Sequence, residues 1–391
     1  MLKKWTLSAV ITVVCLLLIP VSQAQKLIPA APELAAKAWI LIDATTGQVL
    51  TESNADLQLP PASLAKMMTT YIVSNEIEAE RLDENAEVLI SDNAWERGGA
   101  KTDGSTMFLI PRSLVSALDL MHGVIIQSGN DAAIALAEHI SGSESAFVES
   151  MNRQAALLGM KDTQYMNATG LPAEGMVSTA RDLALISRSI ILDHPNYYSI
   201  YAKKYFKHNN INQPNRNRLL WRDSSVDGLK TGHTKAAGYC LVASAKRNDM
   251  RLISVVLGAD NDASRARESQ KLLSYGFRHF DTKNLYSAGD LVKSSTKVWY
   301  GTEEFLNLTV ADDVTLTFPR GAQKKLAANI LIDEQIEAPV QLGQELGRLQ
   351  ISLDDEILVD LPLVADRDIE ESGFMSRFFD WIVLFFTKII S

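Results

Sequence analysis

The chain has 391 residues, of which 47% are hydrophobic and 22% are charged. This length suffices for two domains with a sizeable core, and so ordinary a composition excludes a largely disordered chain. The formal net charge of −9 argues against nucleic acid as the main partner, because proteins that bind nucleic acid carry a basic face.

The first segment, residues 1–24, predicts a secretory signal peptide. A pair of lysines is followed by an almost entirely apolar run from Leu7 to Pro20, and small residues precede a cleavage point after Ala24. The run is short for a membrane span, which favours cleavage over the alternative of an uncleaved anchor. Cleavage removes Cys15 and leaves Cys240 alone, so the exported chain depends on packing rather than on an internal disulfide.

Residues 25–281 predict a domain of mixed helices and strands. Two apolar runs flank residues 43–47, whose composition is typical of a hairpin turn. The segment from Ser178 to Asp182 is typical of a helix start, because a hydroxyl cap is followed three residues later by an acid. The predicted helices span residues 64–75, 113–127, 131–140 and 145–158, and two further strands are predicted at residues 238–245 and 251–258.

The pattern changes near Asp281. Apolar residues alternate along residues 282–365, for example at Leu306, Leu308 and Val310. Alternation with a period of two predicts strands that bury one face. We therefore expect residues 282–365 to form a separate small all-β domain.

The last segment, residues 366–391, predicts an amphipathic helix that lies on a membrane surface. Along a helix, Phe374 to Ser391 divides into a polar arc, which only Leu384 interrupts, and an opposite face of large apolar residues. Charges in the polar arc break any continuous apolar run, so a helix in the membrane interface fits better than a span. A terminal helix docked on the protein's own core is the alternative.

Three short motifs follow one another in the chain and carry the candidate chemistry. Each motif alone is a weak signal, but their order and local context together form a strong one. The motifs are Ser63-Leu64-Ala65-Lys66, Ser128-Gly129-Asn130 and Lys230-Thr231-Gly232.

The first motif predicts a nucleophile and its base. Ser63 and Lys66 are three residues apart on a predicted helix, so both side chains lie on one face. Two prolines just upstream set Ser63 in the first turn, where free N–H groups and partial positive charge are found. A serine hydroxyl needs a base, and lysine becomes that base when burial and neighbouring cations lower its pKa.

The second motif is predicted to stand in a loop before a helix, and the third on an edge strand. We expect Ser128 to relay a proton towards the leaving amine and Asn130 to bind the substrate amide. Lys230 supplies positive charge near Ser128, and its strand accepts a substrate peptide as an additional strand.

The remaining residues of the third motif are predicted to contact the substrate backbone and carboxylate. Thr231 offers a hydroxyl to a substrate carboxylate, and Gly232 leaves room for the substrate backbone. The backbone N–H groups of Ser63 and His233 form the predicted oxyanion hole.

The motifs and their flanking residues, such as Pro61 to Thr69, Gly123 to Ala132, Gln213 to Asn217 and Asp227 to Thr234, resemble low-molecular-mass D-alanyl-D-alanine carboxypeptidases of the penicillin-binding protein 5 and 6 type. The resemblance covers nearly the whole chain. It implies an α/β (α+β) penicillin-recognising serine enzyme domain, with an antiparallel sheet flanked by helices, followed by a small all-β domain and an amphipathic helix.

The resemblance also implies the reaction and its place. The expected enzyme removes the terminal D-alanine from peptidoglycan pentapeptides through an acyl-Ser63 intermediate, and penicillin and other β-lactams acylate Ser63 in place of the substrate. The expected location is the periplasmic face of the bacterial inner membrane, with the terminal helix on the membrane surface.

Two more features follow from the resemblance. Arg265 matches the arginine that binds the terminal carboxylate, a task that suits a guanidinium; a surface arginine is the alternative, because Arg267 lies two residues on. The segment Glu96 to Ser105 resembles the loop that borders the cleft, but it is unusually charged. No cofactor or metal is implied, since the histidines are scattered without ligand spacing.

Three alternative functions remain at this point. A class A serine β-lactamase needs a glutamate between the second and third motifs, whereas Glu303-Glu304 comes after the third. A D,D-endopeptidase that cuts cross-links is compatible with the same motifs. A weakly catalytic cell-wall scaffold is disfavoured, because the complete set of motif residues is present.

Overall fold

The computed structural model describes residues 28–100, 104–333 and 335–390. The predicted signal peptide, including Cys15, lies outside them. The helices are α1 (Lys66–Glu78), α2 (Asp92–Trp95), α3 (Ala117–His122), α4 (Asn130–Ser141), α5 (Glu144–Leu157), α6 (Ala180–Asp193), α7 (Pro195–Tyr198), α8 (Leu219–Arg222), α9 (Asp262–His279) and α10 (Phe374–Ile390). Tighter or wider turns form the 3₁₀ segments η1 (Ala62–Ala65), η4 (Ser199–Ala202) and η5 (Ala322–Lys325) and the π segments η2 (Glu96–Ala100) and η3 (Gly123–Gln127).

The strands comprise β1 to β9 before α9 and β10 to β16 after it. The first group is β1 (Ala38–Asp43), β2 (Val49–Ser53), β3 (Glu87–Leu89), β4 (Leu114–Ser116), β5 (Tyr205–His208), β6 (Ile211–Pro214), β7 (Val226–Thr234), β8 (Gly238–Arg247) and β9 (Met250–Ala259). The second group is β10 (Phe280–Tyr286), β11 (Leu291–Lys297), β12 (Phe305–Val310), β13 (Val314–Pro319), β14 (Leu326–Ile332), β15 (Glu345–Leu353) and β16 (Glu356–Ala365).

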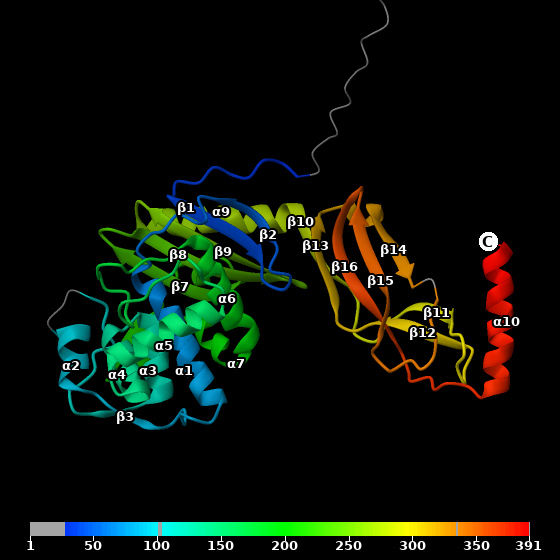
Figure 1. The fold of residues 1–391 in the computed structure, drawn as a ribbon. Helices are drawn as coiled ribbons and strands as arrows, with labels where there is room; N and C mark the ends of the chain where they lie inside the picture. Colours follow the sequence, from blue (N-terminus) through cyan, green and yellow to red (C-terminus); the bar gives the residue numbers. More distant parts are fainter. Residues whose placement is uncertain (1–27, 101–103, 334, 391) are drawn as a thin grey trace, which may run out of the picture. The chain divides into compact units, whose positions relative to one another are not determined.

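A five-stranded antiparallel sheet organises the first domain. Its order is β2-β1-β9-β8-β7. Helix α9 covers one face, whereas α6 and η1 pack on the other (Figure 1). Because both faces are covered, β1 is buried along its whole length, which explains its continuous apolar run. Strand β7 lies at the edge of the sheet, as predicted for the third motif.

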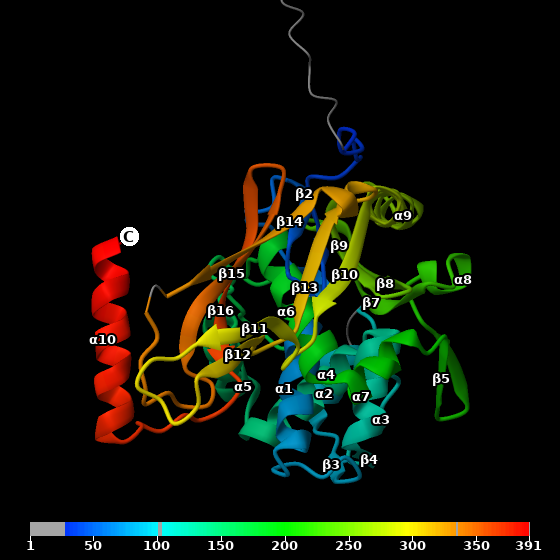
Figure 2. The same cartoon turned by 90° about the vertical axis from the view of Figure 1, so that its right-hand side faces the viewer.

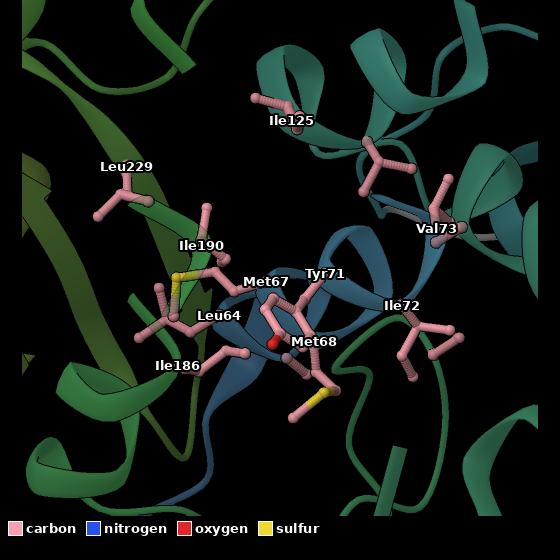
Figure 3. Packing of buried hydrophobic residues seen from close by; sticks show 14 of the residues in the cluster. Leu64, Met67, Met68, Tyr71, Ile72, Val73, Ile125, Ile186, Ile190 and Leu229 are labelled. Carbon is pink, nitrogen blue, oxygen red and sulfur yellow. The ribbon is translucent and has the colours of Figure 1, made fainter. Parts of the chain in front are cut away.

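Helix α1 runs through the middle of the helical layer. Every residue from Lys66 to Ser74 is buried, as expected of a helix with neighbours on all sides. Figure 3 shows Met67 and Leu64 among Ile190 of α6 and Leu229 of β7. The first motif therefore stands on one of the most enclosed segments of the domain.

Capping side chains explain where two of the helices begin. The Thr179 hydroxyl accepts a hydrogen bond from the Asp182 N–H at 3.1 Å, which confirms the helix start predicted there. The helix predicted over residues 113–127 begins too early. Leu114–Ser116 forms β4, and Ser116 then caps α3 through the N–H of Asp119 at 3.1 Å. The predicted end at Gln127 is confirmed, although the last five residues form the π segment η3.

Among the described residues after α9, the regular elements are strands, apart from η5 and α10. A five-stranded sheet of order β11-β12-β16-β15-β14 packs with the β10–β13 pair (Figure 2). Leu306, Leu308 and Val310 are buried, so the predicted alternation is confirmed. The chain holds a second Ser-x-x-Lys sequence, Ser294-Ser295-Thr296-Lys297, on β11, and its Lys297 pairs with Glu304 at 2.7 Å on the surface.

A buried network of oxygen atoms joins β1 to this second group of strands. One carboxylate oxygen of Asp43 accepts from the Thr282 hydroxyl at 2.7 Å. The other accepts from the N–H groups of Thr45 and Thr46, each at 2.9 Å. The Thr317 hydroxyl lies 3.0 Å from that of Thr282, so a single aspartate organises the junction.

Helix α10 leaves its aromatic face uncovered. Asp380, in the polar arc, accepts from the Tyr300 N–H at 2.8 Å, and Leu384 is only 8% exposed. In contrast, Trp381 is 54% exposed and Phe385 50% exposed. The arc that Leu384 interrupts is therefore the side that contacts the protein, whereas the aromatic face is exposed. Among the described residues, no helix is long and apolar enough to cross a bilayer.

Candidate active site

The first motif brings Ser63 and Lys66 together at the start of α1. Lys66 Nζ lies 3.2 Å from Ser63 Oγ, 2.6 Å from Asn130 Oδ1 and 2.5 Å from the Thr169 carbonyl oxygen. The last two oxygens can only accept hydrogen bonds. A neutral amine has two N–H groups and one lone pair, so these acceptors take both N–H groups. The lone pair is then left for the Ser63 hydroxyl.

Burial supplies the neutral amine. Desolvation of the fully buried Lys66 side chain lowers its pKa to about 7, with Arg216 as a further lowering influence and Asp131 as an opposing one. A pKa near neutrality leaves a large neutral fraction at physiological pH, which is what general base catalysis requires. The predicted cause, burial together with nearby cations, is thus present.

Ser128 stands between η3 and α4 in a left-handed backbone conformation. Its φ angle is 67°, a region that costs a non-glycine residue about 1–3 kcal/mol and persists where surrounding structure imposes it. The surroundings include α4, whose first residue Asn130 donates its N–H to the Ser105 carbonyl at 2.8 Å. Asp131 accepts from the N–H groups of Met107 and Leu109, which holds the segment after the charged loop against α4.

Lys230 reaches Ser128 from the edge strand β7. Its Nζ donates to Ser128 Oγ at 2.8 Å and to the Thr231 carbonyl at 3.2 Å. Burial lowers the pKa of Lys230 well below its usual range, and Arg216, Arg265 and the protonated form of Lys66 act in the same direction. A carboxylate that enters this site favours the protonated form. The positive charge predicted at this lysine therefore depends on an anion beside it.

Two glycines allow close packing around Ser63. A Cβ on Gly232 would lie 3.1 Å from the Pro61 carbonyl oxygen and 3.3 Å from Ala62 Cβ, so this glycine makes room for η1. That role differs from the predicted one of leaving room for the substrate. A Cβ on Gly170, where φ is +81°, would lie 1.8 Å from the Ala62 carbonyl oxygen.

Thr231, His233 and Arg265 line the same cleft as Ser63. The His233 ring stacks on Tyr239 at 3.9 Å between centroids. Arg265 is 7% exposed, and its guanidinium donates to the Gly232 carbonyl at 3.1 Å and pairs with Asp262. The structure thus places Arg265 in the cleft, whereas Arg267 pairs with Glu268 and is absent from the lining.

The cleft has a volume of about 880 Å³, near the upper end of the range of about 300–1,000 Å³ typical of ligand sites. Ser63, Ser128, Asn130, Thr231, Gly232, His233 and Arg265 contribute to it, whereas Lys66 and Lys230 lie beneath. Gly104 and Ser105 also line it, so the charged loop borders the cleft as expected. Among the described residues, no cluster of three or more His, Cys, Asp or Glu side chains is placed to hold a metal ion.

Sequence reasoning assigned no role to Thr169, Gly170 or Arg216. The side-chain oxygen of Asn167 accepts from the N–H groups of Thr169 and Gly170 at 3.1 and 2.7 Å, which turns the Thr169 carbonyl towards Lys66. An asparagine followed at short distance by threonine and glycine signals such a turn. Arg216 donates to the Gln127 carbonyl at 3.0 Å, a contact between segments distant in sequence that no local pattern signals.

A hydroxyl beside a buried amine, a second serine bonded to a second lysine and a cleft along an edge strand define a serine acyl-transfer enzyme with the penicillin-recognising fold. The chain belongs to the D-alanyl-D-alanine carboxypeptidase family, whose model matches residues 25–261. Residues 280–371 match the C-terminal domain of penicillin-binding protein 5.

Two relatives from Escherichia coli K12 and one solved structure resemble nearly the whole chain. D-alanyl-D-alanine carboxypeptidase DacC is 45% identical over 359 residues, which are 91% of this chain and 90% of the relative. DacA is 43% identical over 386 residues, which are 97% and 96%. The structure of penicillin binding protein 5 from Haemophilus influenzae covers 88% of this chain and 100% of its own, with 41% identity and a TM-score of 0.82. The chain is therefore a serine-type D-Ala-D-Ala carboxypeptidase that binds penicillin.

Proposed function

We propose that Ser63 is the nucleophile of this carboxypeptidase and that neutral Lys66 takes its proton. The observation that carries the proposal is the 3.2 Å contact between Lys66 Nζ and Ser63 Oγ, made by an amine whose pKa is about 7. Ser63 Oγ attacks the carbonyl carbon of the penultimate D-alanine and forms an acyl ester. The C–N bond then breaks, and water later hydrolyses the ester and releases the tetrapeptide.

Ser128 and Lys230 complete the proton path to the leaving amine. Their 2.8 Å hydrogen bond places a hydroxyl between the lysine and the cleft. When the C–N bond breaks, Ser128 donates its proton to the departing D-alanine and is reprotonated from Lys230. A substrate carboxylate nearby raises the pKa of Lys230 and so keeps a proton available.

The substrate is held by its backbone and by its terminal carboxylate. Thr231 and Arg265 receive the carboxylate, and Asn130 contacts the amide of the bound peptide. The N–H groups of Ser63 and His233 stabilise the oxyanion of the tetrahedral intermediate. Arg265 is already held by the Gly232 carbonyl, which fixes the guanidinium before substrate arrives.

Mass spectrometry with penicillin tests this assignment. The wild-type enzyme should gain the mass of one penicillin, and digestion should locate it on the peptide that contains Ser63. Ser63→Ala should gain none while retaining the wild-type melting temperature. Ser294→Ala is the matched control, since it removes a hydroxyl from the second Ser-x-x-Lys sequence, on β11. Full labelling of Ser63→Ala would refute the nucleophile.

We further propose that the enzyme works at the periplasmic face of the inner membrane, anchored by α10. The exposed Trp381, Phe385 and Phe378 support this, because aromatic side chains favour the membrane interface. The proposed parts are the signal peptide 1–24, the peptidase domain 25–281, the β domain 282–365 and the anchor 366–391.

Vesicle flotation tests the anchor. Deletion of the residues after Asp366 should release an active enzyme from vesicles with anionic lipid. The triple variant Phe378→Ser, Trp381→Ser, Phe385→Ser keeps the helix length and should be released as well. Unchanged flotation of both variants would reject α10 as the anchor.

A further inference from the structure

A second pocket lies next to the catalytic cleft. It has a volume of about 300 Å³, at the lower end of the range typical of ligand sites. Gly170, Leu171 and Thr234 line both the cleft and this pocket. The two cavities are therefore adjacent, and a ligand bound at Ser63 can extend from one into the other.

The direction of the bound peptide places this pocket on the side of the acyl group. In the proposed mechanism, the terminal carboxylate lies at Thr231 and the scissile carbonyl at the N–H of His233. The peptide chain ends at this carboxylate, so its earlier residues lie along β7 beyond His233. Thr234 is the next residue of β7. The residue that precedes D-Ala-D-Ala therefore lies beside Thr234 and the second pocket.

Hydrogen bonds hold the walls of the pocket in place. Leu59, which precedes two prolines of the lining, exchanges two backbone hydrogen bonds with Ser178, each at 2.9 Å. The Asn167 side chain donates to the Leu171 carbonyl at 2.9 Å, and the same asparagine orients Thr169. One wall of the pocket thus belongs to the turn that positions the proposed base. A pocket held in this way is ready for a ligand before the ligand arrives.

Apolar side chains and one carboxylate determine what the pocket can bind. Pro61, Leu171 and Met176 line it, and Met176 is only 5% exposed. Glu174 is the only charged lining residue in the part of the chain that the structure describes. Methylene groups gain from burial against apolar walls, and a carboxylate pairs with a cation. The pocket therefore fits a side chain that has an aliphatic stem and a cationic end.

A tight turn presents the Glu174 carboxylate to a ligand. The Met176 N–H donates to the Ala173 carbonyl at 3.2 Å, and Gly175 has a φ angle of +80°, as the third position of a type II turn requires. Glu174 occupies the second position, and its side chain is exposed. No residue within the described ranges forms a hydrogen bond or an ion pair with this carboxylate, so it is free to pair with a ligand.

We propose that this pocket binds the side chain of the stem residue before D-Ala-D-Ala, and that Glu174 selects stems in which this side chain ends in a free amine. The inference rests on the acyl-Ser63 mechanism proposed above and specifies which pentapeptides that mechanism processes fastest. A diamino acid has such a side chain. Acylation of its amine, as in a cross-link, removes the charge. The enzyme therefore favours pentapeptides whose diamino acid is not yet acylated.

Two pentapeptides that differ only at this amine test the proposal. Both end in D-Ala-D-Ala after a lysine, and in one of them the lysine amine is acetylated. Release of D-alanine gives kcat/KM for each peptide, and the wild-type enzyme should favour the free amine. Glu174→Gln should lower this preference by about two- to fivefold, the usual size of an exposed ion pair. Glu174→Lys should lower it further, because it brings like charges together.

Glu149→Gln is the matched control, since Glu149 is an exposed glutamate on α5 that lines neither cavity. It should leave the preference unchanged. The proposal is overturned if the wild-type enzyme processes both peptides equally, or if Glu174→Gln keeps the wild-type preference. Failure of the underlying mechanism has a different signature, namely the absence of a penicillin adduct on Ser63.

Discussion

The side-chain nitrogen of Lys230 lies 2.8 Å from the hydroxyl oxygen of Ser128. One residue stands on the edge strand β7 and the other in the loop before α4, so this contact connects the sheet to the helical layer across the cleft. The proposed mechanism places both residues on one proton path, so it predicts that their substitutions are non-additive.

Ser128→Ala and Lys230→Ala should each slow penicillin acylation by about 10²–10⁴-fold, the usual contribution of a proton-transfer group. The double variant should be little slower than the worse single variant. Stopped-flow measurement of acylation with a chromogenic β-lactam gives the three rates. If the double variant were instead slowed by the product of the two single effects, the two side chains would act independently.

The acceptors around Lys66 allow a sharp test of its protonation state. Arginine keeps the positive charge but stays protonated in proteins. Lys66→Arg should therefore lose acylation by at least the same factor as Lys66→Ala, about 10²–10⁴-fold. Near-normal acylation by Lys66→Arg would mean that only a cation is needed there.

Gly170 supports the nucleophile segment sterically. In Gly170→Ala, the added methyl group would lie 1.8 Å from the Ala62 carbonyl oxygen, at a φ of +81°. We expect it to lower the free energy of unfolding by more than the roughly 1–2 kcal/mol of left-handed strain alone and to slow acylation.

Gly159→Ala separates strain from collision. Gly159 also has a positive φ, +75°, but nothing lies within 4 Å of its added methyl group. Urea unfolding of both variants should give a clearly larger loss for Gly170→Ala. Equal losses would show that the contact with Ala62 is unimportant.

How much of the site was predictable depends on the range of the interactions. Lys66 and Ser63 share one helical turn, so spacing alone predicted their contact, and continuous or alternating apolar runs predicted β1 and β12. The proximity of Lys230 to Ser128 was predicted because each residue belongs to a short motif that is recognisable in the sequence. The family that these motifs resemble combines them in one site.

Contacts that depend on tertiary packing were missed. The Thr169 carbonyl contacts Lys66 although the two residues are 103 positions apart in the sequence. Arg216 and Gln127, which also form a hydrogen bond, are 89 positions apart. No periodicity carries such information. The packing of Gly232 against η1 was missed for the same reason, because the direction in which a Cβ would point is known only once β7 and η1 are packed.

The junction at Asp43 should contribute measurably to stability. Thr282→Val removes the hydroxyl that donates to Asp43 at 2.7 Å and leaves a buried carboxylate oxygen with one partner fewer. We expect a loss of about 1–3 kcal/mol in the free energy of unfolding. Thr315→Val, on the neighbouring strand β13 and without a hydrogen bond to Asp43, is the control and should cost less. If both variants lost a similar free energy of unfolding, the hydrogen bond to Asp43 would make no special contribution to stability.

The pH dependence of acylation tests the central claim most directly, namely that a neutral Lys66 activates Ser63. The neutral amine is the active form, and its fraction falls about tenfold for each pH unit below the pKa, which for Lys66 is about 7. The second-order rate constant for acylation by a β-lactam should therefore rise roughly tenfold per unit at acidic pH and level off above about 7. A rate constant that stays flat across the range from about pH 5 to about pH 8 would contradict the account.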